Sequence, residues 1–107
     1  MPLVTTNEML KKAQAGHYAV GAFNVENMEM VMAVIKAAEE MNSPVIMQTT
    51  PSTVKYAGLD YYLAMVRTAA ERASVPVAIH LDHGSSFELA MQALRTGYTS
   101  IMISRLF

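Results

Sequence analysis

The 107-residue sequence contains no cysteine, which excludes a disulfide framework and any thiolate ligand for a metal. It has no excess of basic residues, with 8 lysines and arginines against 9 acidic residues, so nothing indicates a nucleic-acid partner. No apolar run approaches the roughly 18 residues of a membrane span, and no basic stretch followed by an apolar one opens the chain. The expectation is a cytoplasmic globular domain whose metal, if it binds one, relies on imidazole and carboxylate.

Four apolar segments alternate with segments of helical periodicity, which predicts an α/β fold built from consecutive βα units. The predicted strands are Tyr18–Asn24, Val45–Thr49, Val75–Leu81 and Tyr98–Ile103. Helices are predicted between them and ahead of the first strand, over about residues 5–15, 27–42, 60–73 and 85–95. The first strand is almost continuously apolar, as expected where helices bury a parallel sheet on both faces.

Local signals indicate where some of these elements begin. Thr5 with Glu8, and Ser85 with Glu88, have the spacing of a capping box at a helix start. The stretch 50–53, Thr-Pro-Ser-Thr, is predicted to be a polar loop that leaves the second strand.

Three titratable side chains follow the third apolar run. His80, Asp82 and His83 precede Gly84, at the predicted carboxyl end of a strand. In α/β folds such a position holds a group rigidly while the next loop opens it to substrate. An aspartate beside a neutral histidine offers a proton carrier and a metal ligand close together. The alternative is that these residues are only polar strand ends satisfied by neighbouring backbone.

Three motifs carry a resemblance to a known family. Residues 76–88 (PVAIHLDHGSSFE), 21–25 (GAFNV) and 97–103 (GYTSIMI) resemble, in the same order, segments of the class II, metal-dependent fructose-bisphosphate and tagatose-bisphosphate aldolases. The likeness extends from about residue 3 to residue 103. The resemblance implies a TIM (β/α)8 barrel, which needs about 250 residues. Residues 1–107 would then be the amino-terminal half of such a barrel, with its first four strands.

The same resemblance implies roles for individual residues. His83 matches a metal ligand of the family, usually for zinc, and Asp82 matches its catalytic acid–base residue. Asn24 and Thr50 match positions near the substrate, although either could equally cap a loop. His80 has the strand parity of Asp82 and is expected to orient it from inside the sheet.

The implied reaction is the metal-dependent cleavage of fructose 1,6-bisphosphate to dihydroxyacetone phosphate and glyceraldehyde 3-phosphate, with tagatose 1,6-bisphosphate as the alternative substrate. The metal acts as a Lewis acid on the ketone, and Asp82 moves the hydroxyl proton. The rival chemistry needs a desolvated lysine. Lys11, Lys12 and Lys36 lie on predicted helices and Lys55 in a predicted loop, so the metal route is favoured. A homo-oligomer is expected.

Strand alternation alone sends residues 82 and 83 to opposite faces of the sheet. For both to reach one site, the chain must leave regular strand geometry between Leu81 and Gly84. Glycine at position 84 makes that departure easy.

The sequence also departs from the family pattern. A catalytic zinc site needs about three protein ligands, and only His83 is a confident one here. Residues 104–107 replace a family segment of the type Asp-Gly-Ser-His or Asp-Ala-Ser-His, which suggests truncation. We expect the fragment alone to be inactive, with two unpaired strand edges and an uncovered apolar inner face. The alternative is a non-catalytic half-barrel that serves as an assembly module.

Overall fold

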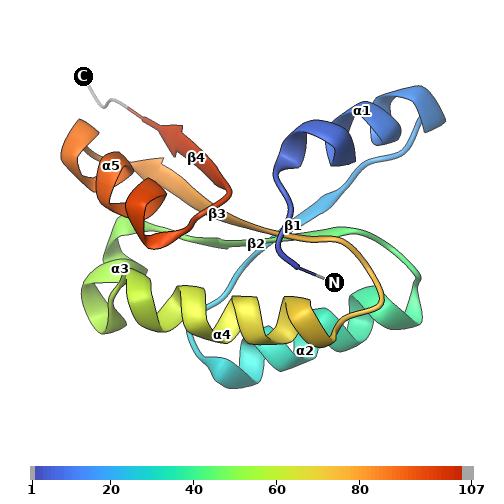
Figure 1. The fold of residues 1–107 in the computed structure, drawn as a ribbon, viewed down its shortest axis with the longest axis horizontal. Coiled ribbons are helices and arrows are strands. Elements are labelled where there is room, and N and C mark those ends of the chain that lie inside the picture. Colours follow the sequence, from blue (N-terminus) through green and yellow to red (C-terminus); the bar gives the residue numbers. More distant parts are fainter. Residues whose placement is uncertain (1, 105–107) are drawn as a thin grey trace.

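The computed structural model describes residues 2–104, which form a four-stranded parallel sheet and five helices (Figure 1). The strands, adjacent in chain order, are β1 (Gly21–Asn24), β2 (Val45–Thr49), β3 (Val77–Gly84) and β4 (Ser100–Ile103). The helices are α1 (Thr6–Gly16), α2 (Met28–Glu40), α3 (Pro51–Ala57), α4 (Leu59–Arg72) and α5 (Phe87–Thr96). This arrangement confirms the predicted α/β fold of an incomplete TIM barrel. None of these helices is long and apolar enough to cross a membrane.

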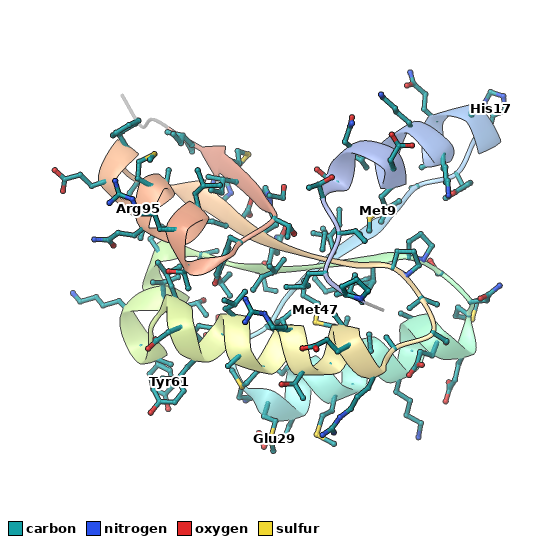
Figure 2. The ribbon with its side chains drawn as sticks, in the orientation of Figure 1. Met9, His17, Glu29, Met47, Tyr61 and Arg95 are labelled. Carbon is teal, nitrogen blue, oxygen red and sulfur yellow. The ribbon has the colours of Figure 1, made fainter. Side chains whose placement is uncertain are left out.

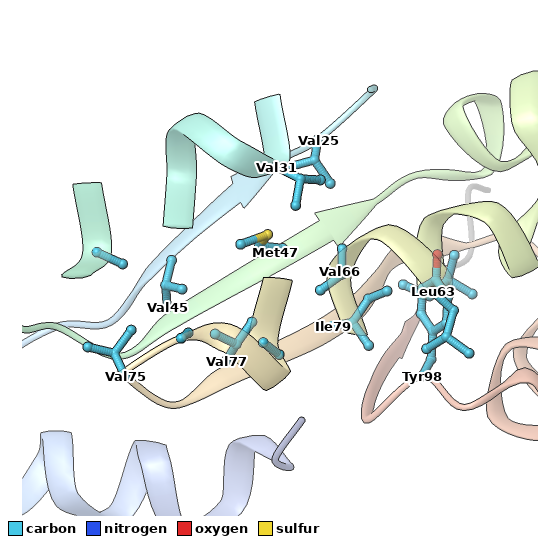
Figure 3. Close-up of a cluster of buried hydrophobic side chains, with 14 of the residues drawn as sticks. Val25, Val31, Val45, Met47, Leu63, Val66, Val75, Val77, Ile79 and Tyr98 are labelled. Atoms are coloured by element: carbon cyan, nitrogen blue, oxygen red, sulfur yellow. The ribbon is translucent and has the colours of Figure 1, made fainter. Parts of the chain in front are cut away.

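The main hydrophobic core lies between one face of the sheet and helices α2, α4 and α5. Alternate strand residues point to this face, because side chains along a strand alternate. Figure 3 shows Met47 and Ile79 of the sheet close to Leu63 and Val66 of α4. The strand residues of this core are Val45, Met47, Val77, Ile79 and Leu81.

Helix α1 packs on the opposite face of the sheet, which is the inner face of a barrel (Figure 1). Its Met9 contacts a small second core with Ile46 and Ala78 (Figure 2). The helix before the first strand thus covers the inner face near the amino-terminal ends of β2 and β3. The expectation of an uncovered apolar inner face therefore holds only in part: α1 covers Ile46 and Ala78, whereas Met102 of β4 stays 37% exposed.

The first strand is shorter and more exposed than predicted. It begins at Gly21 instead of Tyr18, and Phe23 keeps 51% of its surface exposed. The prediction of burial on both faces was wrong because an open groove, lined by Tyr18 and Phe23, borders the outer face of β1, which is the edge strand among residues 2–104. The third strand, by contrast, runs on to Gly84, beyond its predicted end at Leu81.

Two of the predicted helix starts need correction. Ser86, and not Ser85, caps α5, because its hydroxyl accepts a hydrogen bond of 3.0 Å from the Leu89 N–H. Thr5 precedes α1 as predicted, but its side chain makes no capping hydrogen bond.

The predicted polar loop after β2 is a helix. Helix α3 starts at Pro51, whose fixed φ and missing N–H suit the first helical position. It ends at Gly58, whose φ of 104° is a conformation that side chains other than glycine's rarely adopt. Lys55 is consequently on a helix and not in a loop.

A buried polar contact ties the second strand to the start of the fourth. The hydroxyls of Thr49 and Tyr98 lie 2.8 Å apart, and both residues are almost fully buried. Burial raises the pKa of Tyr98 to about 12, although the hydrogen bond to Thr49 opposes the shift. The phenol therefore stays neutral and satisfies the buried threonine hydroxyl.

Candidate functional site

A row of polar side chains crosses the inner face of the sheet, from the carboxyl ends of β1 and β2 through the middle of β3 to the first residue of β4. The strand register places Asn24 beside Gln48, Gln48 beside His80, and His80 beside Ser100. One residue from each of the four strands thus contributes to the row. Asp82 follows two residues after His80 and points to the same face.

Hydrogen bonds link this row to Asp82. The Gln48 side-chain amide donates to Asn24 Oδ1 at 2.7 Å and to Asp82 Oδ2 at 3.3 Å. The other carboxylate oxygen, Oδ1, lies 3.5 Å from His80 Nε2. His80 Nδ1 is in turn 2.6 Å from Ser100 Oγ. Contacts from both sides therefore hold the carboxylate, as expected of a preorganised acid–base group.

His83 reaches the same cluster through a break in the strand. Its backbone has a φ of 53°, and the pairing of β3 with β4 shifts register between Leu81 and Gly84. Such a bulge re-aims a side chain. His83 Nε2 lies 3.5 Å from Asp82 Oδ2, and 63% of its side chain is exposed, against 18% for Asp82. The predicted departure from strand geometry is confirmed, and it leaves the imidazole open to solvent.

The left-handed residue of this break is His83 itself and not Gly84. Glycine is needed at 84 for a different reason: a Cβ there would lie 2.8 Å from the carbonyl oxygen of Met102. The backbones of β3 and β4 approach too closely at this point for any side chain.

Thr50 lies apart from the carboxylate cluster. Its hydroxyl is 3.1 Å from the hydroxyls of both Ser52 and Thr53, at the start of α3. Thr53 then donates to Glu26 Oε1 at 2.8 Å. The structure thus places Asn24 in the row that contacts Asp82, and Thr50 in a neighbouring hydroxyl cluster.

His80 is largely buried, and this changes its proton affinity. Burial lowers the pKa of His80 below its ordinary 6.5, and the Asp82 carboxylate opposes the shift only in part. The imidazole is therefore neutral at neutral pH, so that one ring nitrogen donates and the other accepts. A neutral ring suits a group that lies between Asp82 and Ser100 and orients the Asp82 carboxylate.

We expect this burial to make stability depend on pH. The unfolded chain binds a proton at His80 more readily than the folded chain, so stability is lost as pH falls from about 6.5 through the lowered folded pKa. His80→Gln should flatten that acid-side decline in urea unfolding measured without metal between pH 5 and 8, roughly the range in which histidine titrates. His17→Gln replaces an exposed histidine at the end of α1 and is the control. This variant should still show the acid-side decline of stability. An unchanged decline in the His80 variant would contradict this assignment.

The donor set of the cluster fits part of a metal site. An exposed imidazole next to a carboxylate is suited to zinc and other borderline divalent metals. Within residues 2–104, however, no group of three or more His, Asp or Glu side chains is arranged to hold a metal ion. The described residues therefore offer ligands for an incomplete site.

Comparison with known families shows to which protein family the chain belongs. The family model described as fructose-bisphosphate aldolase class-II matches residues 4–105. The chain belongs to the class II fructose-bisphosphate aldolase family. This result confirms the resemblance drawn from the three sequence motifs.

Aldolase relatives match almost the whole chain. The fructose-bisphosphate aldolase of Thermus caldophilus is 52% identical over 103 residues, covering 96% of this chain and 33% of that protein. The 6-phospho-5-dehydro-2-deoxy-D-gluconate aldolase of Halalkalibacterium halodurans is 44% identical, covering 96% and 37%. The solved YdjI aldolase of Escherichia coli K12 superposes with a TM-score of 0.87 at 39% identity, covering 94% and 39%. The chain thus spans between a third and two-fifths of the length of these aldolases.

Two polar members of the row, Gln48 and Ser100, were missed by the sequence analysis. Each lies in a strand that otherwise reads as apolar, and each has the parity of the inner face. That parity was the available signal, because a polar residue on the inner face of a parallel strand needs a partner. Their contacts with Asp82 and His80 depend on register across the sheet, which a single sequence does not contain.

Proposed function

We propose that this chain provides the acid–base part of a metal-dependent aldolase that cleaves a ketose 1,6-bisphosphate. The observation that supports this best is the Asp82 carboxylate, held between Gln48 and His80 and placed beside His83. The cluster lies at the carboxyl ends of parallel strands, where TIM-barrel enzymes carry their active sites.

Asp82 is proposed to accept the proton of the sugar hydroxyl at the carbon where the chain is cleaved, and to return it in the condensation direction. Gln48 donates to one carboxylate oxygen and so leaves that oxygen less free to rotate. His80, neutral and hydrogen-bonded to Ser100, holds the other side of the carboxylate. Gln48 and His80 are therefore positioning residues, while Asp82 contacts the reacting hydroxyl.

His83 is proposed as a ligand of the catalytic metal, with zinc as the expected ion. Its ring is the most exposed of the three side chains in the cluster, which leaves a nitrogen free to bind. A bound divalent metal supplies Lewis acidity toward the ketone oxygen of the substrate. The further ligands and the phosphate-binding loops are proposed to come from the residues by which longer aldolases exceed this chain.

Fructose 1,6-bisphosphate is the proposed substrate, because the family and the Thermus caldophilus relative carry that name. Tagatose 1,6-bisphosphate is the alternative. The relative named for a 6-phospho-5-dehydro-2-deoxy-D-gluconate matches the same residues, so this part of the barrel serves aldolases of more than one sugar. Asn24, beside Gln48, and Thr50 are the proposed substrate contacts.

The test is a cleavage assay with zinc, in which the 107-residue chain is assayed alone and together with the remaining part of the Thermus caldophilus aldolase. We expect glyceraldehyde 3-phosphate to form only in the combined sample, because the chain alone offers an incomplete ligand set. Activity of the chain alone would contradict that ligand count. No activity in a complex that has demonstrably formed would reject the catalytic proposal and favour the half-barrel assembly module.

A further inference from the structure

A chain of three hydroxyl groups ends on a carboxylate beside the candidate site. Ser52 Oγ and Thr53 Oγ1 each lie 3.1 Å from Thr50 Oγ1, and Thr53 donates to Glu26 Oε1 at 2.8 Å. The chain of hydroxyls joins the segment after β1 to the start of α3, which follows β2. Thr50 is a proposed substrate contact, whereas Thr53 and Glu26 have no part in the proposed catalysis.

Buried neighbours hold both ends of the contact between Thr53 and Glu26. Thr53 is only 2% exposed, so its hydroxyl needs a partner within the protein. The backbone carbonyl of Glu26 accepts a hydrogen bond of 2.9 Å from the hydroxyl of Tyr62, which is fully buried. Burial raises the pKa of Tyr62 above its ordinary 10, and the charge of Glu26 raises it further, so the phenol keeps the hydrogen that it donates. The backbone of Glu26 is therefore held where its carboxylate meets Thr53.

The carboxylate decides in which direction the hydrogens of these hydroxyls point. An ionised carboxylate has no hydrogen to give and can only accept. Thr53 has a single hydroxyl hydrogen, which it donates to Glu26. In its contact with Thr50, Thr53 must therefore be the acceptor and Thr50 the donor. By the same count, Thr50 accepts from Ser52.

An oxygen lone pair is what remains available at Thr50. A hydroxyl has one hydrogen and two lone pairs, and Thr50 has already given its hydrogen to Thr53. Thr50 is partly exposed, so a ligand can reach the remaining lone pair. A sugar hydroxyl can donate to it. A charged phosphate oxygen is itself an acceptor and would be repelled.

We propose that Glu26, acting through Thr53, fixes Thr50 as a hydrogen-bond acceptor, so that Thr50 receives a hydroxyl group of the sugar and not a phosphate group. Glu26 and Thr53 are positioning residues, because they act on the substrate only through Thr50. This assignment rests on the proposed function, which places Thr50 beside the substrate. The direction of the hydroxyl hydrogens, by contrast, can be tested without turnover.

Neutron diffraction from crystals of the deuterated 107-residue chain locates the hydroxyl deuterium atoms directly. We expect the deuterium of Thr53 to point at Glu26 Oε1 and the deuterium of Thr50 to point at Thr53 Oγ1. A Thr50 deuterium that points away from Thr53 would overturn the proposal, whatever the activity of the chain.

Steady-state kinetics of the complemented aldolase test the effect on the substrate. Glu26→Gln keeps the shape of the side chain, but its amide can also donate to Thr53, which frees Thr50 to turn its hydrogen outward. The KM for fructose 1,6-bisphosphate should rise about fivefold, the usual contribution of one neutral hydrogen bond, with kcat nearly unchanged. Glu29→Gln removes an exposed carboxylate in the first turn of α2 (Figure 2) and is the matched control, which should keep the KM. Thr53→Ser retains the hydroxyl and should keep the KM as well.

A double variant separates this role from a merely structural one. Thr50→Val removes the hydroxyl and should raise the KM by a similar factor. In that background Glu26→Gln should have no further effect, because its influence passes through the Thr50 hydroxyl. An equal additional loss in both backgrounds would mean that Glu26 only stabilises the loop, and an unchanged KM in Thr50→Val would mean that Thr50 does not contact the substrate; either result would overturn the proposal.

Inorganic phosphate, used as a competitive inhibitor, distinguishes the two kinds of ligand group. Its inhibition constant should be the same for the parent and for Thr50→Val, because Thr50 offers no hydrogen to an anion. Weaker inhibition of the variant would assign Thr50 to a phosphate group and overturn the proposal. A complex that forms but does not cleave substrate would reject the catalytic proposal, and the neutron result would then decide the direction of the hydroxyls by itself.

Discussion

Replacing Asp82 with asparagine in the complemented aldolase should lower turnover by about 10²- to 10⁴-fold, which is the usual contribution of a positioned acid–base group. Asparagine has nearly the same shape as aspartate and can still accept from Gln48, but it cannot take up the hydroxyl proton. The effect should fall on kcat, with a smaller change in KM, because the missing interaction belongs to the transition state. Steady-state cleavage of fructose 1,6-bisphosphate measures both constants.

Measurement of the metal content distinguishes the acid–base role proposed for Asp82 from the metal-ligand role proposed for His83. The Asp82→Asn enzyme should keep its zinc, measured by atomic absorption, whereas His83→Ala should lose zinc and activity together. Gln48→Ala should reduce kcat less than Asp82→Asn, since it only frees one carboxylate oxygen to rotate. Near-normal turnover by the Asp82 variant would refute the acid–base assignment.

The second large effect is expected in the core. Ile79 is fully buried between the sheet and α4, and its truncation to alanine should lower the free energy of unfolding by about 2–5 kcal/mol. The loss combines the apolar contacts of the removed atoms with the cavity that they leave. Denaturant unfolding of the 107-residue chain, followed by circular dichroism, measures the change.

Ile103 is the matched control, because it is the same residue type in the neighbouring strand β4 and is 53% exposed. Ile103→Ala should change stability by no more than about 0.5 kcal/mol. If Ile79→Ala is too unstable to measure, Ile79→Val should still show a loss of about 0.5–1.5 kcal/mol. Equal losses at the two positions would mean that the sheet is not covered as described.

The order of the elements followed from local sequence, whereas their ends often did not. The apolar runs near Val45 and Val77 predicted strands correctly, because strands of a parallel sheet covered by helices are apolar along their length. The segment after Thr49 was misjudged, because its polar residues resemble a loop while Pro51 in fact starts α3. Serine hydroxyls at 85 and 86 compete for the same cap, and backbone geometry selects Ser86.

The residues of the candidate site were likewise only partly predictable from the sequence. His80, Asp82 and His83 stand together in the sequence, so their proximity was predictable, and the bulge followed from the opposite parities of residues 82 and 83. Gln48 and Ser100 belong to other strands, and they reach Asp82 and His80 only through the register of the sheet. Long-range register is a tertiary property that no local pattern encodes.

The bulge at His83 has a mechanical consequence for a site assembled from many strands. Groups on different strands change their separation whenever the sheet flexes. Asp82 and His83 are neighbours in the chain, and the contact between their side chains is set by a few backbone angles of one strand end. Motion of a surrounding barrel would therefore leave the spacing between Asp82 and His83, the proposed proton carrier and metal ligand, nearly constant, while the distances to groups on other strands vary.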